Sequence, residues 1–518
     1  MKKFSPVEST ELMSSLNISA DETTDTTTLA KGAGINFLGQ LIAVVMIFLT
    51  NVALARLLGS QEFGLFSIGW TFLRLIRLIS SFGLEKGVVR YGSLHWQEDP
   101  IQLRTVLWQS IGMTMTFALI SSVLLFFSAP YIATNVFHKP QLIVVLRAFA
   151  IILILVAGLR ITASATRITQ KMQYSVISSQ IVEPTATIVF VLIAVWLFKG
   201  GLFGALIAWG LAYITALLVS TWQTRRLFPS AFTIRSKVSL FSFDILLFSI
   251  LSSTAGMVLK FNVWIDRLLV GKFLEAADAG IYIAATQLVS LFMVVMMIFK
   301  GIFAPMSARF YAEGQHERLE ELYRVSTKWG LYISFALFLI MVFFPQKIML
   351  VTFGNDYVSG SSTLVILAWT CLFRAFPGAV GILLVMTGNQ KQWFVLSIAA
   401  VSSNIVFDIL LIPPYGINGA AFATMISMFV LFFLGLLQVK LRLNMNPFDK
   451  RYLKGFAATF IAALGLYLWR LVAPQSDLLA VAGSCALSPT IFILSLYFLG
   501  FDREDKIILR RFKRWLLS

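Results

Sequence analysis

Apolar segments of about twenty residues alternate with short polar stretches along almost the whole chain. We find fourteen such segments, each near the roughly 20 residues that a helix needs to cross a membrane. Pro413-Pro414-Tyr415-Gly416, which separates two of them, is typical of a tight turn. The pattern predicts an all-α polytopic membrane protein with about 14 transmembrane helices. The segments are 33–55, 64–83, 105–128, 142–165, 176–198, 202–222, 243–265, 279–302, 329–346, 362–387, 393–412, 417–439, 453–472 and 478–499.

Lysine and arginine are divided unequally between the two sets of connecting segments. If the N-terminus is cytoplasmic, the inner segments hold 28 of these residues and the outer segments hold 7. Cytoplasmic loops of membrane proteins carry such an excess, so we expect both termini to be cytoplasmic. The same bias accounts for the net charge of +17, which therefore does not indicate nucleic-acid binding.

The composition agrees with a membrane protein and offers little reactive chemistry. Hydrophobic residues make up 58% of the chain and charged residues 13%, against about 45–50% and about 25% in soluble proteins. Cys371 and Cys485 lie in apolar runs, and the three histidines lie in separate connecting segments without metal-ligand spacing. We therefore expect no metal site, no cofactor and no catalytic residues, so the chain is predicted not to be an enzyme.

Short matches recur between the two halves of the chain at a spacing of 211 to 220 residues. Asn51-Val52 with Arg56-Leu57-Leu58 matches Asn262-Val263 with Arg267-Leu268-Leu269, and Gly64 then aligns with Gly280. "GLFGALIA" at 201–208 similarly resembles "GINGAAFA" at 416–423. An even number of segments separates the copies, so both would cross the membrane in the same sense. This predicts two pseudo-symmetric six-helix lobes, related by a parallel repeat, and a cleft between them that serves alternating access.

The repeat and the polar stretches divide the chain into six parts. Their expected roles, in order, are a disordered cytoplasmic tail, a six-helix N-lobe, a cytoplasmic linker, a six-helix C-lobe, two further helices and an amphipathic basic cytoplasmic tail. The corresponding residues are 1–28, 29–226, 227–242, 243–440, 441–500 and 501–518.

Basic residues inside the apolar segments are the main candidates for a function. A charge at the centre of a bilayer costs about 2.5–3.5 kcal/mol, so several such residues indicate a polar cavity. Arg74 and Arg77 are three residues apart and share one helix face. A cationic cavity would take an anionic cargo, and arginine suits phosphate or pyrophosphate oxygens in particular. The substrate-binding candidates are Arg74, Arg77, Lys260, Arg374 and Lys300; Arg147 and Arg160 are the other two intramembrane cations.

Two acidic residues, Glu183 and Asp408, lie well inside apolar segments. Glu183 precedes Pro184, which removes a backbone donor and can kink the helix. A buried carboxylate can bind a coupling proton or cation, or it can balance the charge of an interior arginine. The sequence leaves both roles open for both residues.

Several stretches together resemble the polysaccharide-transport branch, which includes O-antigen flippases, of the multidrug/oligosaccharidyl-lipid/polysaccharide exporter superfamily. The resemblance covers about 30–440. It implies a V-shaped cavity between two lobes, lined largely by the first, second, seventh and eighth segments. It also implies movement of polyprenyl-linked oligosaccharide, on a phosphate or pyrophosphate carrier, from the inner to the outer leaflet of a prokaryotic inner or plasma membrane. Besides this cargo, membrane lipids and polysaccharide-assembly enzymes are the implied partners; the oligomeric state stays open. The stretches are "ARLLGSQEFGLFSIG", "SSFGLEKGVVRYGS", "WIDRLLVGKFLEAADAGIYIAATQL", "VTFGNDYVSGSSTLVILAW" and "NIVFDILLIPPYGINGAAFATMIS".

Four other functions are weighed against this one. A flippase for a peptidoglycan lipid precursor would need the same cationic cavity. A multidrug cation antiporter would need an acidic cavity, which the basic excess disfavours. A membrane-embedded glycan polymerase or glycosyltransferase would need a sizeable outer loop, and the predicted outer loops are short. A scaffold without transport would leave the intramembrane charges unexplained.

The predicted topology can be tested with single cysteines placed at each terminus of a variant without Cys371 and Cys485. We expect a membrane-impermeant thiol reagent to label both termini only after cells are broken, because both are predicted to be cytoplasmic. Labelling of the C-terminus in intact cells would contradict the number and orientation of the segments.

Overall fold

A computed structural model describes the backbone of residues 6–233, 239, 241–502 and 504–506. The side chains of 6–31, 33, 254–260, 262–263, 293–300 and 302 lie outside the description. Within the described ranges, all regular secondary structure is helical. The α-helices are α1 (Pro6–Ser80), α2 (Leu84–His95), α3 (Pro100–Tyr131), α4 (Leu142–Ala165), α5 (Met172–Val176), α6 (Glu183–Val191), α7 (Gly201–Leu227), α8 (Pro229–Thr233), α9 (Phe243–Phe273), α10 (Ala276–Val289), α11 (Leu291–Ala312), α12 (His316–Phe343), α13 (Pro345–Phe353), α14 (Ser361–Ala375), α15 (Val380–Met386), α16 (Gln390–Leu443), α17 (Tyr452–Val472) and α18 (Asp477–Phe498). Short 3₁₀ or π-helical turns are Ile132–Val136, Thr166–Thr169, Ile177–Val182, Leu192–Leu197 and Asn355–Gly360.

Each of the fourteen predicted segments coincides with helix. Ten stretches of the described chain are helices long and apolar enough to cross a membrane. Two of them, 34–80 and 390–443, each contain two predicted segments. The all-α fold of a polytopic membrane protein is thus confirmed, whereas the count of 14 crossings stays a prediction.

Two glycines turn the longest helices back on themselves. Gly59 interrupts α1 with a φ of 73°, and Gly416 interrupts α16 with a φ of 58°. Such positive φ values are accessible to glycine at little cost, while a side chain would be strained. The predicted corners at Gly59 and at Pro413–Gly416 are therefore hairpins, with helix on both sides.

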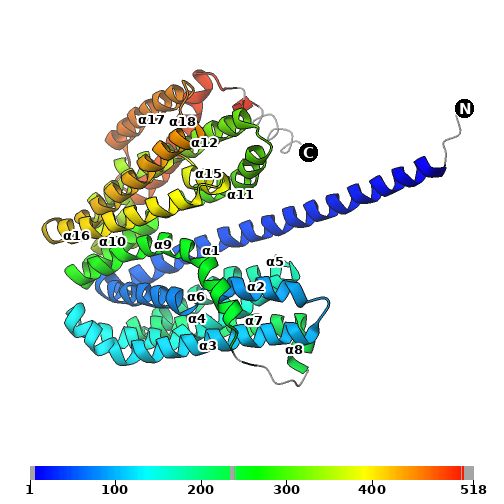
Figure 1. Cartoon of the computed structure of the whole chain (residues 1–518). Helices are drawn as coiled ribbons and strands as arrows, with labels where there is room; N and C mark the ends of the chain where they lie inside the picture. Colours follow the sequence, from blue (N-terminus) through cyan, green and yellow to red (C-terminus); the bar gives the residue numbers. More distant parts are fainter. Residues whose placement is uncertain (1–5, 234–238, 240, 503, 507–518) are drawn as a thin grey trace, which may run out of the picture.

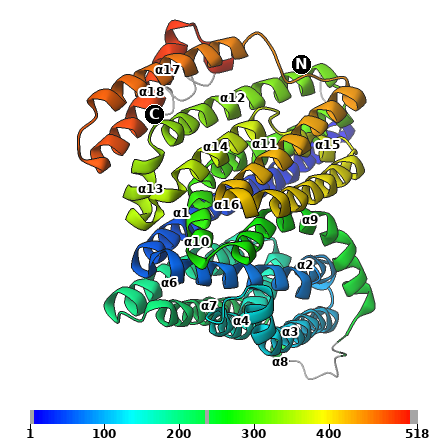
Figure 2. The ribbon, with the colours of Figure 1, turned by 90° about the vertical axis from the view of Figure 1, so that its left-hand side faces the viewer.

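The helices form two lobes with matching internal contacts (Figures 1 and 2). In the N-lobe α3 packs against α4, and α4 packs against α7; in the C-lobe α12 packs against α14, and α14 packs against α16. Under the internal repeat, the two halves of α1 in the N-lobe correspond to α9 and α10 in the C-lobe. These matching contacts confirm the pseudo-symmetric lobes that the internal repeat predicts.

The lobes meet most closely where the two repeat-related corners cross. A Cβ atom on Gly64 would lie 1.7 Å from the carbonyl oxygen of Ala276, and one on Gly280 would lie 2.3 Å from that of Ser60. Only hydrogen atoms fit between these backbones, as in close helix crossings of other membrane proteins. The two glycines that align in the sequence repeat thus lie next to each other across the lobe interface.

The last two helices are attached to the C-lobe by an ionic cluster at the end of the molecule that carries both termini. The buried ammonium group of Lys328 on α12 lies 3.2 Å from Asp502 and 3.0 Å from Asp505, which follow α18. Arg451, before α17, forms a bidentate pair with Glu321 on α12 at 2.7 and 2.9 Å. This hydrogen-bonded pair lowers the pKa of Glu321.

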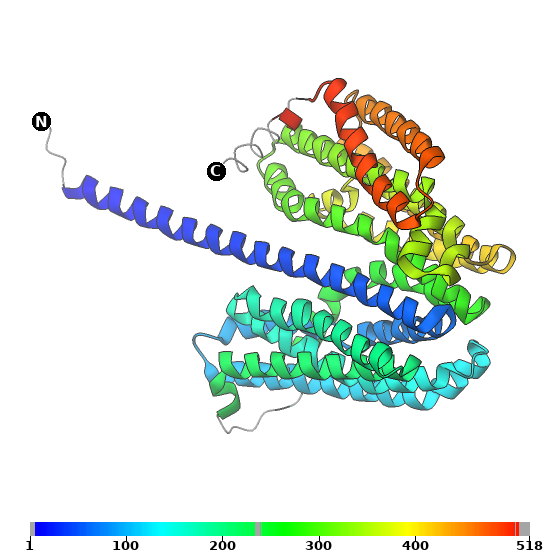
Figure 3. The same ribbon diagram turned by 180° about the vertical axis from the view of Figure 1, so that it is seen from behind.

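The predicted terminal and linking segments are described only in part. In the structure α1 begins at Pro6, so helix occupies most of the segment 1–28, for which a disordered tail was expected, and it projects from the lobes (Figure 3). The linker 227–242 contains the short helix α8, and 234–238 and 240 lie outside the described residues. Most of the basic tail, 507–518, also lies outside them.

Substituting Gly64→Ala should destabilise the closed contact between the lobes. The added methyl group would meet a backbone carbonyl that cannot rotate away, and such overpacking typically costs about 1–3 kcal/mol. We expect a lower apparent melting temperature of the purified protein in detergent. The control is Gly210→Ala on α7, where the nearest atom to an added Cβ is 4.0 Å away. Equal melting temperatures for the two variants would contradict the glycine contact.

Candidate functional site

A cavity of about 260 Å³ lies between the lobes, adjacent to the glycine contact. It is lined by both halves of α1 and by α4, α6 and α7 from the N-lobe, and by α9 and α10 from the C-lobe. These include the first, second and seventh predicted segments and the start of the eighth, the helices that the family resemblance implies. The polar and aromatic lining residues used below are Thr50, Asn51, Trp70, Arg74, Arg77, Arg160, Glu183, Trp209, Tyr213, Trp264, Arg267 and Gln287.

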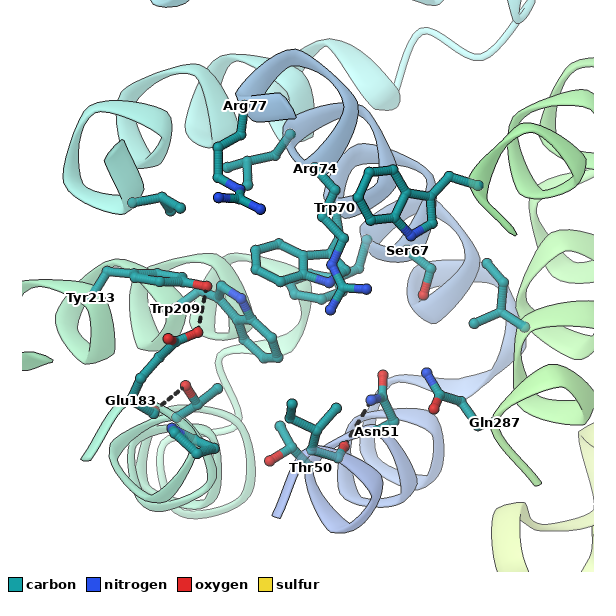
Figure 4. Close-up of a pocket in the computed structure, with 18 of the residues that line it drawn as sticks. Thr50, Asn51, Ser67, Trp70, Arg74, Arg77, Glu183, Trp209, Tyr213 and Gln287 are labelled. Carbon is teal, nitrogen blue, oxygen red and sulfur yellow. Dashed lines mark hydrogen bonds between the residues drawn. The ribbon is translucent and has the colours of Figure 1, made fainter. Parts of the chain in front are cut away.

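Arg74 extends into the middle of this cavity, and its guanidinium group points toward Thr50 and Asn51 (Figure 4). The guanidinium carbon lies 5.0 Å from the ring centre of Trp70 and 6.0 Å from that of Trp264. Cation–π contacts of this kind attract an arginine without neutralising it. Because Trp264 belongs to the C-lobe, Arg74 is held between the two lobes with its charge available to a ligand.

Two other arginines in the cavity are neutralised by carboxylates. Arg77 pairs with Glu85 at 2.9 Å. Arg160 pairs with Glu183 at 2.8 Å. The Tyr213 hydroxyl donates to the second oxygen of Glu183, also at 2.8 Å (Figure 4). Both carboxylate oxygens of Glu183 are therefore engaged. This geometry favours charge balance over ion coupling as the role of Glu183.

The backbone around Glu183 is irregular in a way that its sequence explains. A π-helical turn, Ile177–Val182, ends just before Glu183, and a second one, Leu192–Leu197, follows α6. Pro184 lacks an N–H group and cannot donate within the helix, which favours a local rearrangement. Such π-turns alter the direction of side chains and occur often at functional sites. Here the rearranged segment presents Glu183 to Arg160 and Tyr213.

Arg267 is the second cavity arginine without a carboxylate partner in the described part of the chain. It lies on α9 of the C-lobe and donates a long hydrogen bond, 3.4 Å, to the Thr286 hydroxyl. Its Nε atom is buried and has no hydrogen-bond partner among the described residues. Arg74 and Arg267 therefore provide two positive charges, one from each lobe, that form no ion pair among the described residues.

A second buried polar cluster lies within the C-lobe, where α9 packs against α16. The side-chain amide of Asn404 donates to Asp266 and to Asp408, both at 2.8 Å. The Thr424 hydroxyl donates to the other oxygen of Asp266, at 2.8 Å. One oxygen of Asp408 is buried and accepts no hydrogen bond from the described residues. The cluster thus brings two carboxylates to one amide group and leaves one acceptor oxygen open.

The carboxylate and hydroxyl oxygens of this cluster suit a proton or a hard cation rather than a soft transition metal. Among the described residues, no three His, Cys, Asp or Glu side chains gather in a way that could hold a metal ion. Two ionised carboxylates this close together would repel each other, so one bound positive charge would stabilise the pair.

Comparison with known proteins identifies the family. The sequence profile of the family described as "Polysaccharide biosynthesis protein" matches residues 29–311, more than half of the chain. The chain belongs to this family. A second profile, MatE, matches residues 255–410. Together they confirm the predicted membership of the multidrug/oligosaccharidyl-lipid/polysaccharide exporter superfamily.

Individual relatives of this chain agree with the family assignment. The chain is 22% identical to the uncharacterized membrane protein MJ1068 of Methanocaldococcus jannaschii over 77% of the chain and 82% of that protein. It is 24% identical to the probable low-salt glycan biosynthesis flippase Agl15 of Haloferax volcanii over 43% of each protein. A solved structure of the lipid II flippase MurJ in an inward closed conformation superposes with a TM-score of 0.67 at 16% identity, covering 89% of this chain and 99% of MurJ. The chain is therefore a flippase-type membrane transporter of this superfamily.

The structure brings some of the predicted site residues of this transporter together and separates others. Arg74 and Arg77 line the cavity, and Glu183 lies in its wall. Arg374, at the end of α14, is not among the lining residues, and Asp408 belongs to the separate cluster in the C-lobe. Lys260 and Lys300 lie on α9 and α11, and their side chains are outside the described residues.

Two charged residues of the C-lobe that the sequence did not single out are important for the site and for the neighbouring cluster. Arg267 and Asp266 were assigned to the end of an outer connection, because the charged pair ends the apolar run at 265. In the structure α9 continues to Phe273, so both side chains lie well inside the helix. The apolar residues that follow, Leu268, Leu269 and Val270, were the available signal for this longer helix.

Proposed function

We propose that this transporter flips a polyprenyl-linked oligosaccharide, carried on phosphate or pyrophosphate, from the inner to the outer leaflet by alternating access. The observation that carries the proposal is that Arg74 and Arg267 lie in one inter-lobe cavity and form no ion pair among the described residues. A pyrophosphate that links a lipid to a sugar bears two negative charges, which this pair would neutralise. Arginine also offers several donors to phosphate oxygens in a fixed geometry.

The remaining lining suits the sugar end of such a cargo. Trp70, Trp209 and Trp264 contribute aromatic surface, and Asn51 and Gln287 contribute donors and acceptors that can bind hydroxyl groups. Apolar ring faces together with a few polar groups are typical of small-molecule sites. The names of two relatives, a glycan biosynthesis flippase and a lipid II flippase, support the same class of cargo.

A flippase for a peptidoglycan lipid precursor is the second candidate, favoured by the likeness to the MurJ fold. Both cargoes would present a pyrophosphate to the same arginines, so the glycan decides between them. A multidrug cation antiporter fits less well, because the two unpaired charges of the cavity are positive. We also propose that the protein acts without catalysis, in the plasma membrane of a prokaryote and with cytoplasmic termini.

The cargo proposal predicts that Arg74→Gln and Arg267→Gln each reduce flipping about tenfold or more. A hydrogen bond to a charged group contributes about 1.5–3 kcal/mol, and tenfold corresponds to about 1.4 kcal/mol. The measurement is surface display of lipid-linked glycan in cells that lack their own flippase, with lipid II assayed in parallel. Arg147→Gln is the matched control, because Arg147 is an exposed arginine on α4 that does not line the cavity. Full activity of the double variant at normal membrane levels would refute the cavity assignment.

We further propose that Asp408, rather than Glu183, is the site of ion coupling. Asp408→Asn removes one of the two buried carboxylates and with it the need for a bound proton or cation. Transport by this variant should lose its response to an imposed sodium or proton gradient, measured in proteoliposomes. Glu183→Gln is the comparison, because both oxygens of Glu183 already have partners. Unchanged gradient dependence in Asp408→Asn would rule the assignment out.

A further inference from the structure

Two cations of the N-lobe cross the lobe interface near the Gly64–Gly280 contact, at the end of the molecule opposite the termini. Arg56 lies three residues before the turn at Gly59. Its Nε atom donates to the carbonyl oxygen of Thr352 at 2.9 Å, and Nη2 donates to that of Val351. Both carbonyls belong to the last turn of α13 in the C-lobe. The Tyr357 hydroxyl of the C-lobe adds a bond to the carbonyl of Ala55, at 3.0 Å.

The second cation is Lys139, in the connection between α3 and α4. Its ammonium group donates to the carbonyl oxygens of Gly271 and Leu274, both at 2.7 Å. These carbonyls form the C-terminal end of α9 in the C-lobe. Burial at this interface lowers the pKa of Lys139, although the nearby acids Glu275 and Asp278 act in the opposite sense.

The two contacts are alike in chemistry. The last carbonyls of a helix have no partner within the helix and carry the negative end of its dipole. Arg56 supplies donors to such carbonyls on α13, and Lys139 supplies them on α9. In each case a cation of the N-lobe satisfies a helix end of the C-lobe.

The two contacts are also reciprocal under the internal repeat. Arg56 reaches from the first corner of the N-lobe to the second corner of the C-lobe, between α12 and α14. Lys139 reaches from the second corner of the N-lobe, between α3 and α4, to the first corner of the C-lobe, between α9 and α10. The Arg56 contact and the Lys139 contact therefore lie on opposite sides of the pseudo-twofold axis that relates Gly64 to Gly280.

These bonds can break at modest cost. Neither cation forms an ion pair among the described residues, so separation of the lobes strands no buried carboxylate. Arg56 is exposed and Lys139 is half-buried, so water can replace the carbonyls as the lobes part. Bonds of this kind hold two surfaces together reversibly, whereas a fully buried ion pair would be costly to break.

We propose that Arg56 and Lys139 form two outer latches that hold the lobes together at the outer end and that must both open before the cavity can face outward. The proposal rests on alternating access, which is part of the proposed function, but it does not depend on the identity of the cargo. The latches set the balance between the closed outer end and an open one; removal of their bonds shifts the population toward the open state.

The test measures access to the cavity from outside in the absence of cargo. Ser67, which is buried in the cavity wall on the side of the glycine contact, is replaced by cysteine in a Cys371→Ser, Cys485→Ser background. Intact cells are treated with a membrane-impermeant maleimide, and labelling rates are compared. We expect the double variant Arg56→Gln, Lys139→Gln to be labelled about tenfold faster or more, and each single variant to lie between the double variant and the parent.

Lys199→Gln is the matched control, since Lys199 is an exposed lysine predicted at the same outer end, in the corner between α6 and α7. An equal rise in this control would show a general charge effect and would overturn the proposal. Parental labelling of a correctly folded double variant, judged by size-exclusion chromatography, would overturn it as well.

A milder substitution covers the case in which the double variant does not reach the membrane. Tyr357→Phe removes one interlobe hydrogen bond from the Arg56 latch and retains the ring. It should raise the labelling rate about twofold to tenfold; no rise would count against the latches. Failure of the cargo proposal is visible separately, because Arg74→Gln should reduce flipping without changing this labelling.

Discussion

The backbone contact between Gly64 and Gly280 is the constraint on which the rest of the structure depends. Because neither residue has a side chain, two helices from different lobes approach until their backbones touch. This contact sets the distance between the lobes at the end that carries the corners around Gly59 and Leu274. It also determines which residues face one another across the interface: Arg74 and Trp264 in the cavity, and Arg56 and Lys139 with the helix ends of the C-lobe.

The arginines that line the cavity are of two kinds, those paired with a carboxylate and those without such a partner among the described residues. Arg77 is paired with Glu85, and Arg160 is paired with Glu183. Arg74 and Arg267 have no carboxylate partner among the described residues, although each costs free energy in an apolar environment. The proposed anionic cargo would offset this cost by binding to both charges.

Much of the fold follows from periodic patterns that act locally. Stretches of apolar residues predict the helices, because backbone groups in a membrane must be satisfied within the same segment. The turn at Gly416 and the alignment of Gly64 with Gly280 were also visible in the residues, whereas the contact between these two glycines was not. By contrast, hydropathy ended the seventh segment at 265, whereas the helix continues to Phe273. Charged residues interrupt hydropathy without interrupting a helix, so Asp266 and Arg267 were assigned to a connection.

The sequence by itself determined the helical membrane fold, the doubled lobes, the excess of intramembrane cations and the family. These properties depend on composition, spacing and repetition along the chain. Only the tertiary structure decided which charges are neutralised. Glu183 is separated from Arg160 by 23 positions, and Asp266 from Asn404 by 138, so no local pattern links them. Whether an arginine is free or paired depends on distances between helices, and packing alone determines those distances.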